Sequence, residues 1–165
     1  MVQIGQKIKK NKKLINLSKL EKRTNFLKKK GKKIVLCHGV FDLLHVGHIK
    51  HFEKSKSLGH ILVVTLTADK FVNKGPNKPT FDENLRAESL ASLEVVDYVC
   101  INNFKTSINI LKKIRPDFYC KGADYKIIKN DITGEIKNEI KTVKKFKGKV
   151  IFTDEITFSS SNIIN

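Results

Sequence analysis

Two histidines separated by a valine and a glycine form the part of the sequence best suited to chemistry. His45 and His48 follow an uninterrupted apolar run, residues 34–37, which is typical of a strand covered on both faces. Apolar residues then recur at helical spacing, so the pair lies at the start of a helix. Unpaired N–H groups and the helix dipole favour an anion there, and Gly47 lets a phosphate approach the backbone. The segment therefore predicts a site for nucleotide phosphates.

Two other roles for these histidines are compatible with their spacing. Either histidine could act as an ordinary polar helix cap. The pair could also bind zinc, but no cysteine or carboxylate lies at a suitable short spacing to complete a tetrahedral set. The combination of strand, glycine, histidine pair and helix favours phosphate binding over both alternatives, and no protein metal ligand is expected.

The size and composition are those of a single globular domain. The chain has 165 residues, of which 40% are hydrophobic and 30% are charged. No apolar run approaches the length that spans a bilayer, so a membrane partner is not expected. The basic stretch 1–13 lacks the apolar core of a signal peptide, and the three cysteines are interpreted as small buried hydrophobes. Both features favour the cytoplasm.

The formal net charge of +17 is the strongest compositional bias and raises the question of nucleic-acid binding. The lysines are spread along the whole chain, the arginines do not cluster, and there is no aromatic pattern of the RNA-binding type. The basic surface is therefore expected to attract anionic substrates in general, and nucleic acid is not the expected partner.

Residues 1–31 are predicted to form a basic amphipathic leader helix. Its apolar face would contain Leu14, Leu17, Leu20, Phe26 and Leu27. The helix should end near Lys28 and dock on the flank of the domain or on a partner chain.

Strands and helices alternate over residues 32–165. Strands are expected over 33–38, 61–66, 97–101, 117–121 and 149–153. Helices are expected over 47–58, 82–93, 106–113 and 135–146, with a short one from Asp69, a last one near Ser159, and Gly59 ending the first. This alternation predicts an α/β fold with a doubly wound, five-stranded parallel sheet. Ligands of such sheets bind beyond the carboxyl ends of the strands, where the strand order reverses, and the histidine pair follows the first strand.

Basic residues follow the second strand. The turn-rich loop 73–79 carries Lys74 and Lys78 and is either a basic flap or an ordinary exposed loop. Arg86, in the next helix, either snorkels beside a buried apolar stripe or reaches a triphosphate.

Two later segments also end at the carboxyl edge of the sheet. Residues 115–125 indicate an apolar strand that ends in a small-residue turn with a carboxylate and an aromatic ring. Residues 157–164 contain three consecutive serines at a predicted helix start. One serine suffices as a cap, and three hydroxyls would also suit an anion.

The histidine segment resembles the HxGH signature of the cytidylyltransferase-like nucleotidyltransferase superfamily. From about residue 32 to 164 the chain is most similar to heptose 1-phosphate adenylyltransferase domains, which are often fused to a sugar kinase. The motifs that carry this resemblance are Gly39–Asp42, His45–His48, Leu85–Arg86, Pro116–Asp117, Lys121–Tyr125 and Ser159–Ile164. The resemblance implies a Rossmann-like nucleotidyltransferase fold and transfer of a nucleoside monophosphate from an NTP, with ATP favoured, to a sugar phosphate.

The resemblance also implies roles by position. The expected catalytic residues are His45, His48, Lys74 and Arg86. The nucleotide is expected to contact Gly39, Val40, Phe41, His45, Gly47, His48, Arg86, Lys121, Gly122, Asp124, Tyr125, Ser159, Ser160 and Ser161. Asp42, Lys74 and Lys78 are expected at the acceptor, although Asp42 could instead hold its loop through backbone N–H groups.

Further implications concern cofactors and partners. Mg²⁺ would be bound through the NTP phosphates, because lysine and histidine alone screen too little charge. A homodimer and a fused or associated sugar kinase are expected. Residues 154–157 read Asp-Glu-Ile-Thr, where polyol and choline cytidylyltransferases carry Arg-Thr-Glu-Gly, which disfavours CTP. The alternatives are a CTP-dependent cytidylyltransferase for a polyol or sugar phosphate and a non-catalytic nucleotide- or nucleic-acid-binding module.

Overall fold

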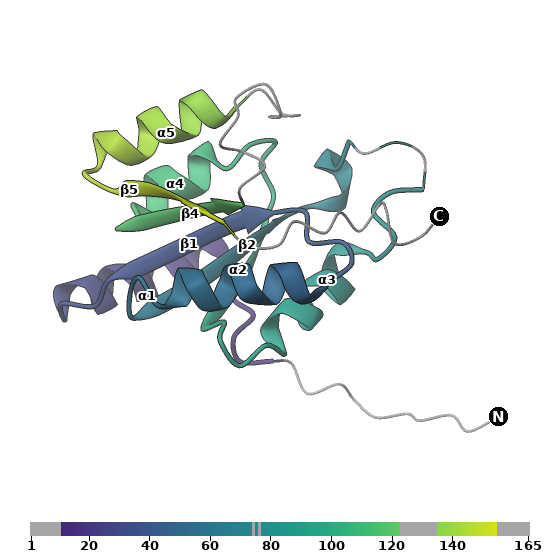
Figure 1. The fold of residues 1–165 in the computed structure, drawn as a ribbon, viewed down its shortest axis with the longest axis horizontal. Helices are drawn as coiled ribbons and strands as arrows, with labels where there is room; N and C mark the ends of the chain where they lie inside the picture. The colour runs from purple at the N-terminus through teal and green to yellow at the C-terminus, as the bar shows by residue number, and fades with distance from the viewer. Residues whose placement is uncertain (1–10, 74, 76, 123–134, 155–165) are drawn as a thin grey trace.

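A computed structural model describes residues 11–73, 75, 77–122 and 135–154 (Figure 1). Its strands are β1 (Ile34–Gly39), β2 (Ile61–Thr67), β3 (Tyr98–Asn102), β4 (Phe118–Gly122) and β5 (Lys149–Thr153). Its helices are α1 (Leu17–Lys29), α2 (Val46–Lys56), α3 (Glu83–Ala91), α4 (Ile108–Ile114) and α5 (Ile136–Lys145), with a 3₁₀ turn η1 (Asp69–Phe71). The elements expected between residues 33 and 153 are therefore confirmed, and the helix expected near Ser159 lies outside the described residues.

The five strands form one parallel sheet in the order β3-β2-β1-β4-β5. The chain moves outward from β1 to β3, then returns to the other side of β1 with β4 and β5. The strand order thus reverses between β1 and β4, and the loop that carries the two histidines leaves the sheet at this point. This confirms the predicted doubly wound α/β fold and places the histidines where such sheets bind ligands.

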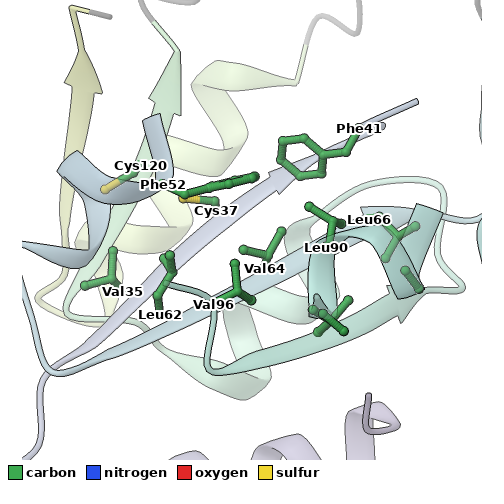
Figure 2. Packing of buried hydrophobic residues seen from close by; sticks show 13 residues of the cluster. Val35, Cys37, Phe41, Phe52, Leu62, Val64, Leu66, Leu90, Val96 and Cys120 are labelled. Carbon is green, nitrogen blue, oxygen red and sulfur yellow. The ribbon is translucent and has the colours of Figure 1, made fainter. Parts of the chain in front are cut away.

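Two apolar cores cover the two faces of the sheet. On one face α2 and α3 contribute Phe52 and Leu90, which pack with Val35, Val64 and other strand residues (Figure 2). On the other face α1, α4 and α5 bury a second cluster that includes Leu20, Leu111, Ile114, Tyr119 and Val143. The central strands are fully covered, as their continuous apolar sequence predicts. Cys37, Cys100 and Cys120 are buried free thiols, so their reading as small hydrophobes is confirmed.

The N-terminal helix packs on the same face of the sheet as α4. The side chain of Asn16 caps α1 by accepting a hydrogen bond from the Lys19 N–H at 2.9 Å. Just before it, the Ile15 N–H donates to the Val99 carbonyl at 3.0 Å, which covers part of the edge of β3. Leu20 is fully buried. Phe26 was expected on the apolar face, but 47% of it is exposed, with the Lys30 ammonium 4.5 Å from the ring centroid.

Gly59 has a different role from the one expected. Helix α2 ends at Lys56, and its C-cap Ser57 stays in the right-handed helical region. A Cβ on Gly59 would lie 2.7 Å from Cγ2 of Val35 and 3.1 Å from the Lys33 carbonyl oxygen. The glycine is therefore needed for close packing of the turn on β1, not for ending the helix.

Gly59→Ala should consequently lower the free energy of unfolding by about 1–3 kcal/mol through overpacking. Urea denaturation measures this change. Gly122→Ala is the matched control, because its added Cβ would meet nothing within 4 Å. Equal stability of both variants would contradict the packing role.

Within the described residues, no helix is both long and apolar enough to cross a membrane.

Candidate active site

Two imidazole rings stack at the start of α2. His45 is the N-cap residue, with extended backbone, and its Nδ1 accepts a hydrogen bond from the Gly47 N–H at 3.2 Å. The Nδ1 atom of His48 accepts from the backbone N–H of His45 at 3.4 Å. The ring centroids lie 3.9 Å apart, with the planes tilted by 39°. The histidines thus form a reciprocal capping box with each other's backbone.

In the neutral form of each ring, this capping fixes the tautomer. An imidazole that accepts at Nδ1 carries its proton on Nε2, which is then a hydrogen-bond donor. Burial lowers the pKa of His45 below its ordinary value, so this ring is neutral near pH 7. The helix start therefore holds a pair of oriented Nε2–H donors beside its own N–H groups, an arrangement suited to phosphate oxygens.

The ring of Phe41 packs against the ring of His48. Its ring is buried and meets the rings of His48 and Phe52 edge-on, at centroid distances of 5.6 and 5.2 Å. To reach this position Phe41 takes φ 52°, a left-handed backbone conformation that a bulky residue rarely adopts. A Cβ on Gly39 would lie 3.0 Å from the Phe41 ring, so the absence of a side chain at Gly39 makes room for it. Figure 2 shows Phe41 at the end of the apolar cluster near Leu90.

Asp42 joins the histidine loop to the loop before α3. Its carboxylate accepts hydrogen bonds from the backbone N–H groups of Thr80 at 2.8 Å and Phe81 at 3.0 Å. Burial acts to raise the pKa of Asp42, but these donors and the positive charge of Lys78 outweigh it, so the pKa is lowered overall. The carboxylate is thus ionised and holds two loops together. Asp42 thus holds its loop through backbone N–H groups, which is the alternative role considered for it. The same contacts bring Lys78 to this edge of the sheet.

The guanidinium of Arg86 is buried in the protein and is not exposed at the surface of the site. Its side chain is 0% exposed, and Nη2 donates to Asp69 at 2.6 Å and to the Thr67 carbonyl at 2.8 Å. Nη1 donates to the Val40 carbonyl, and Nε donates to the Phe81 carbonyl at 3.0 Å. Four of its five N–H donors are therefore used to tie β1, β2 and α3 together. A guanidinium so engaged has one N–H left for a ligand, and the contact expected between Arg86 and the β- and γ-phosphates stays a prediction.

Lys121 is also buried, at the carboxyl end of β4. Its Nζ lies 3.3 Å from Oε2 of Glu139, and both side chains are more than nine-tenths buried. The hydroxyl of Ser107 donates to the other oxygen of Glu139 at 2.6 Å. In this structure Lys121 offsets the buried carboxylate of Glu139, and its expected contact with the nucleotide stays a prediction. Lys74, Asp124, Tyr125, Ser159, Ser160 and Ser161 lie outside the described residues.

Two buried polar contacts near the site were not predicted from the sequence. His38 Nδ1 lies 2.9 Å from Oγ1 of Thr65, and His51 Nδ1 lies 2.7 Å from Oγ1 of Thr153. The second contact ties α2 to β5, one turn after His48. A usable signal existed, since His38, Thr65 and Thr153 interrupt otherwise apolar strands near their carboxyl ends.

These two histidines should make stability depend on pH. Burial, followed by the charge of Lys121, lowers the pKa of His38 to about 3 and that of His51 to about 4. Below the unfolded pKa of 6.5 the unfolded chain binds protons that the folded chain does not, so stability falls as pH falls.

Between pH 6.5 and about 5, where carboxylates titrate little, each histidine should contribute up to about 1.4 kcal/mol per pH unit. Above pH 6.5 this slope should fade and approach zero by about pH 8, where the unfolded histidines are deprotonated as well. Urea denaturation across this range measures the slope, and His51→Phe should reduce it. A slope unchanged in that variant would contradict the assignment.

No group of three or more His, Cys, Asp or Glu side chains in the described part of the chain is placed to hold a metal ion. Near the histidines, Asp42 and Asp69 both already accept hydrogen bonds from protein N–H groups. The zinc alternative therefore gains no support from the described residues.

Comparisons with known proteins agree with this geometry. The sequence matches the family model described as Cytidylyltransferase-like over residues 36–165. It is 43% identical over 133 residues to Bifunctional protein HldE from Aliarcobacter butzleri, covering 79% of this chain and 28% of that protein. Bifunctional protein HldE from Methylobacillus flagellatus is 38% identical over 155 residues, covering 92% of this chain and 30% of that protein. The chain thus spans less than a third of these curated relatives.

A solved structure has a similar fold. The lipopolysaccharide core biosynthesis protein from Thermoplasma volcanium is 27% identical and superposes with a TM-score of 0.64, covering 77% of this chain and all of that one. The family match includes the histidine pair and nearly the whole sheet. The resemblance inferred from the motifs is confirmed, and the chain belongs to the cytidylyltransferase-like family.

Proposed function

We propose that this chain transfers a nucleoside monophosphate from an NTP to a sugar phosphate. The observation that carries the proposal is the pair of capped imidazoles at the start of α2, which hold Nε2–H donors at the point where the strand order reverses. Such donors stabilise charge that develops on phosphate oxygens. Membership of the cytidylyltransferase-like family supports the same reaction.

The proposed reaction is a direct displacement at the α-phosphorus. An oxygen of the sugar phosphate forms the new bond to phosphorus, the bond from phosphorus to the β-phosphate bridge breaks, and pyrophosphate leaves with its electron pair. Reactions of this type depend on positioning and electrostatic stabilisation, so no protein nucleophile is needed. His45 and His48 would donate to the triphosphate, with Phe41 fixing the ring of His48 from below.

The fold family implies a divalent cation, and Mg²⁺ is our proposal. The described carboxylates beside the histidines are occupied by protein donors, so they do not form a cation site. This fits an ion that arrives on the triphosphate. When bound, Mg²⁺ would neutralise part of the phosphate charge.

The names of the relatives also support proposals for the substrates and the partners. The curated relatives are named bifunctional, which supports a fused or associated sugar kinase as the source of the sugar phosphate. In this reading residues 1–31 form the leader, residues 32–165 form the transferase, and a homodimer is the assembly. ATP is the favoured donor, CTP is the alternative, and Lys74, Lys78, Asp124, Tyr125 and the three serines would contact the substrates.

The test is a pyrophosphate-release assay with Mg²⁺, each of the four common NTPs, and a panel of sugar and polyol phosphates. We expect release with ATP and a sugar 1-phosphate, and none without an acceptor. Release only with CTP would establish the cytidylyltransferase alternative. NTP binding without release under any combination would instead indicate a non-catalytic binding module.

A further inference from the structure

A cavity of about 430 Å³ lies at the opposite end of the sheet from the histidines. It is bordered by the amino ends of β1, β4 and β5, and Figure 1 shows the end of α1 and the turn from α5 to β5 together at this end. The charged residues that line it are Lys28, Lys32, Lys33, Arg115, Asp117 and Lys147. Strand β1 has six residues, so the length of the strand, about 20 Å, separates the cavity from the histidines.

The positive charge of this cavity exceeds what the fold itself requires. Helices α1, α4 and α5 all end nearby, and cations stabilise the negative ends of helix dipoles. Each dipole end is equivalent to about half a negative charge. Three such ends and the carboxylate of Asp117 therefore offset only about half of the five positive charges. The remainder suits an anion with two or more charges.

Part of the basic lining is already engaged with the protein. Lys28 Nζ donates to the carbonyls of Ile114, at 2.7 Å, and Arg115, and burial lowers its pKa. Lys33 pairs with Asp117 at 3.2 Å. Asp117 also accepts a hydrogen bond from the Ile34 N–H at 2.8 Å, so its carboxylate has a structural role.

The rest of the lining has donors to spare. Lys32 and Lys147 have exposed side chains that make no hydrogen bond or ion pair within the part of the chain that the structure describes. The Arg115 guanidinium lies 4.8 Å from the centroid of the Phe146 ring, and its Nε donates to the Lys112 carbonyl at 3.2 Å. This placement orients Arg115, while its Nη groups make no hydrogen bond to the described residues. Two ammonium groups and an oriented guanidinium thus border one concave space.

We propose that this cavity binds the phosphate or pyrophosphate group of a small molecule, at a site separate from the transfer site. Arginine and lysine together are the side chains that recognise phosphate oxygens most often. The volume is within the range of small-molecule pockets. A concave space of this size does not match an extended nucleic-acid surface. The proposal does not depend on the transfer reaction.

The test is an NMR titration of the whole ¹⁵N-labelled chain with inorganic pyrophosphate, because backbone amides report the two sites separately. We expect amides of residues 31–33 and 146–148 to shift as one group and those of residues 45–48 as another. Lys32→Ala/Lys147→Ala should weaken binding at the first group by at least about tenfold and leave the second group unchanged. Titrations with inorganic phosphate and ATP should distinguish a free anion from a nucleotide as the preferred ligand.

Lys137→Ala/Lys141→Ala is the matched control, since it removes the same charge from exposed positions of α5 outside the cavity. Unchanged binding in this control is expected. Equal weakening in both double variants, or no shift of residues 31–33 and 146–148, would overturn the proposal. Tighter, strongly salt-dependent binding of a single-stranded oligonucleotide at these amides would also overturn it, in favour of a nucleic-acid surface.

Discussion

His48→Ala is expected to lower the rate of pyrophosphate release by about 10²–10³-fold, which is the cost of removing one oriented donor to a developing oxyanion. The same change should lower the free energy of unfolding by only about 1 kcal/mol. The stability cost is small because each contact that His48 is seen to make is weak: a 3.4 Å hydrogen bond from the His45 N–H, the edge contact with Phe41 and the ring contact with His45. Initial rates and urea denaturation of the same preparation measure both effects.

A variant that keeps one hydrogen-bond donor at position 48 separates the catalytic role of His48 from its role in packing. His48→Gln retains an amide N–H and should therefore retain more activity than His48→Ala. Lys54→Ala, an exposed change on the same helix, is the control and should leave both rate and stability unchanged. If His48→Ala lost stability in proportion to activity, the histidine would be a structural cap and not a phosphate donor.

Arg86→Met should cause the largest loss of stability, about 3–5 kcal/mol, because it leaves the partners of a buried charge without their donor. The carboxylate of Asp69 and three backbone carbonyls would lose their hydrogen bonds. Since domains are stable by only about 5–15 kcal/mol, much of the chain could unfold. Arg86→Lys keeps the charge without the planar fork and should give an intermediate loss, with a folded protein in which KM and kcat can be measured.

Arg23→Met is the control for Arg86. Arg23 is exposed, and its Nε donates to the hydroxyl of Tyr98 at 2.8 Å, so its loss should cost less than about 1 kcal/mol. In Arg86→Lys we expect unfolding and catalytic efficiency to be affected together, because the guanidinium positions the loops around the histidines. Full stability with a raised KM for the NTP alone would show that Arg86 contacts the phosphates instead.

The fold could be predicted because its signals are local. Strands β1, β2, β3 and β5 are short runs that contain Val and Ile, and β4 is a short run of Phe, Tyr and Cys before Lys121. Asp82 marks the start of α3 by accepting from the N–H groups of Asn84 and Leu85. Helix α4 begins two residues later than expected, at Ile108, and its N-cap Ser107 makes no capping hydrogen bond because its hydroxyl donates to Glu139. Boundaries were therefore predictable where the cap is local and shifted where a distant residue competes.

The candidate site could likewise be predicted where its contacts are local in sequence. The histidine turn was predictable because both capping contacts lie within four residues. The placement of Arg86 depends on Val40 and Thr67, and that of Lys121 depends on Glu139, all distant in sequence. The family resemblance implied nucleotide contacts at both positions, and for Arg86 the residues alone left snorkelling as an alternative. Both side chains are buried against oxygen atoms from distant segments, where they support the site.

The most direct test of nucleotidyl transfer is ³¹P NMR of the chain with Mg²⁺, ATP and a sugar 1-phosphate that carries ¹⁸O in its phosphate. We predict equal amounts of pyrophosphate and ADP-sugar, with ¹⁸O in the bridge between the two phosphorus atoms, because an acceptor oxygen attacks the α-phosphorus. Release of ADP with a doubly phosphorylated sugar, or no reaction of any NTP with any sugar or polyol phosphate, would contradict the account.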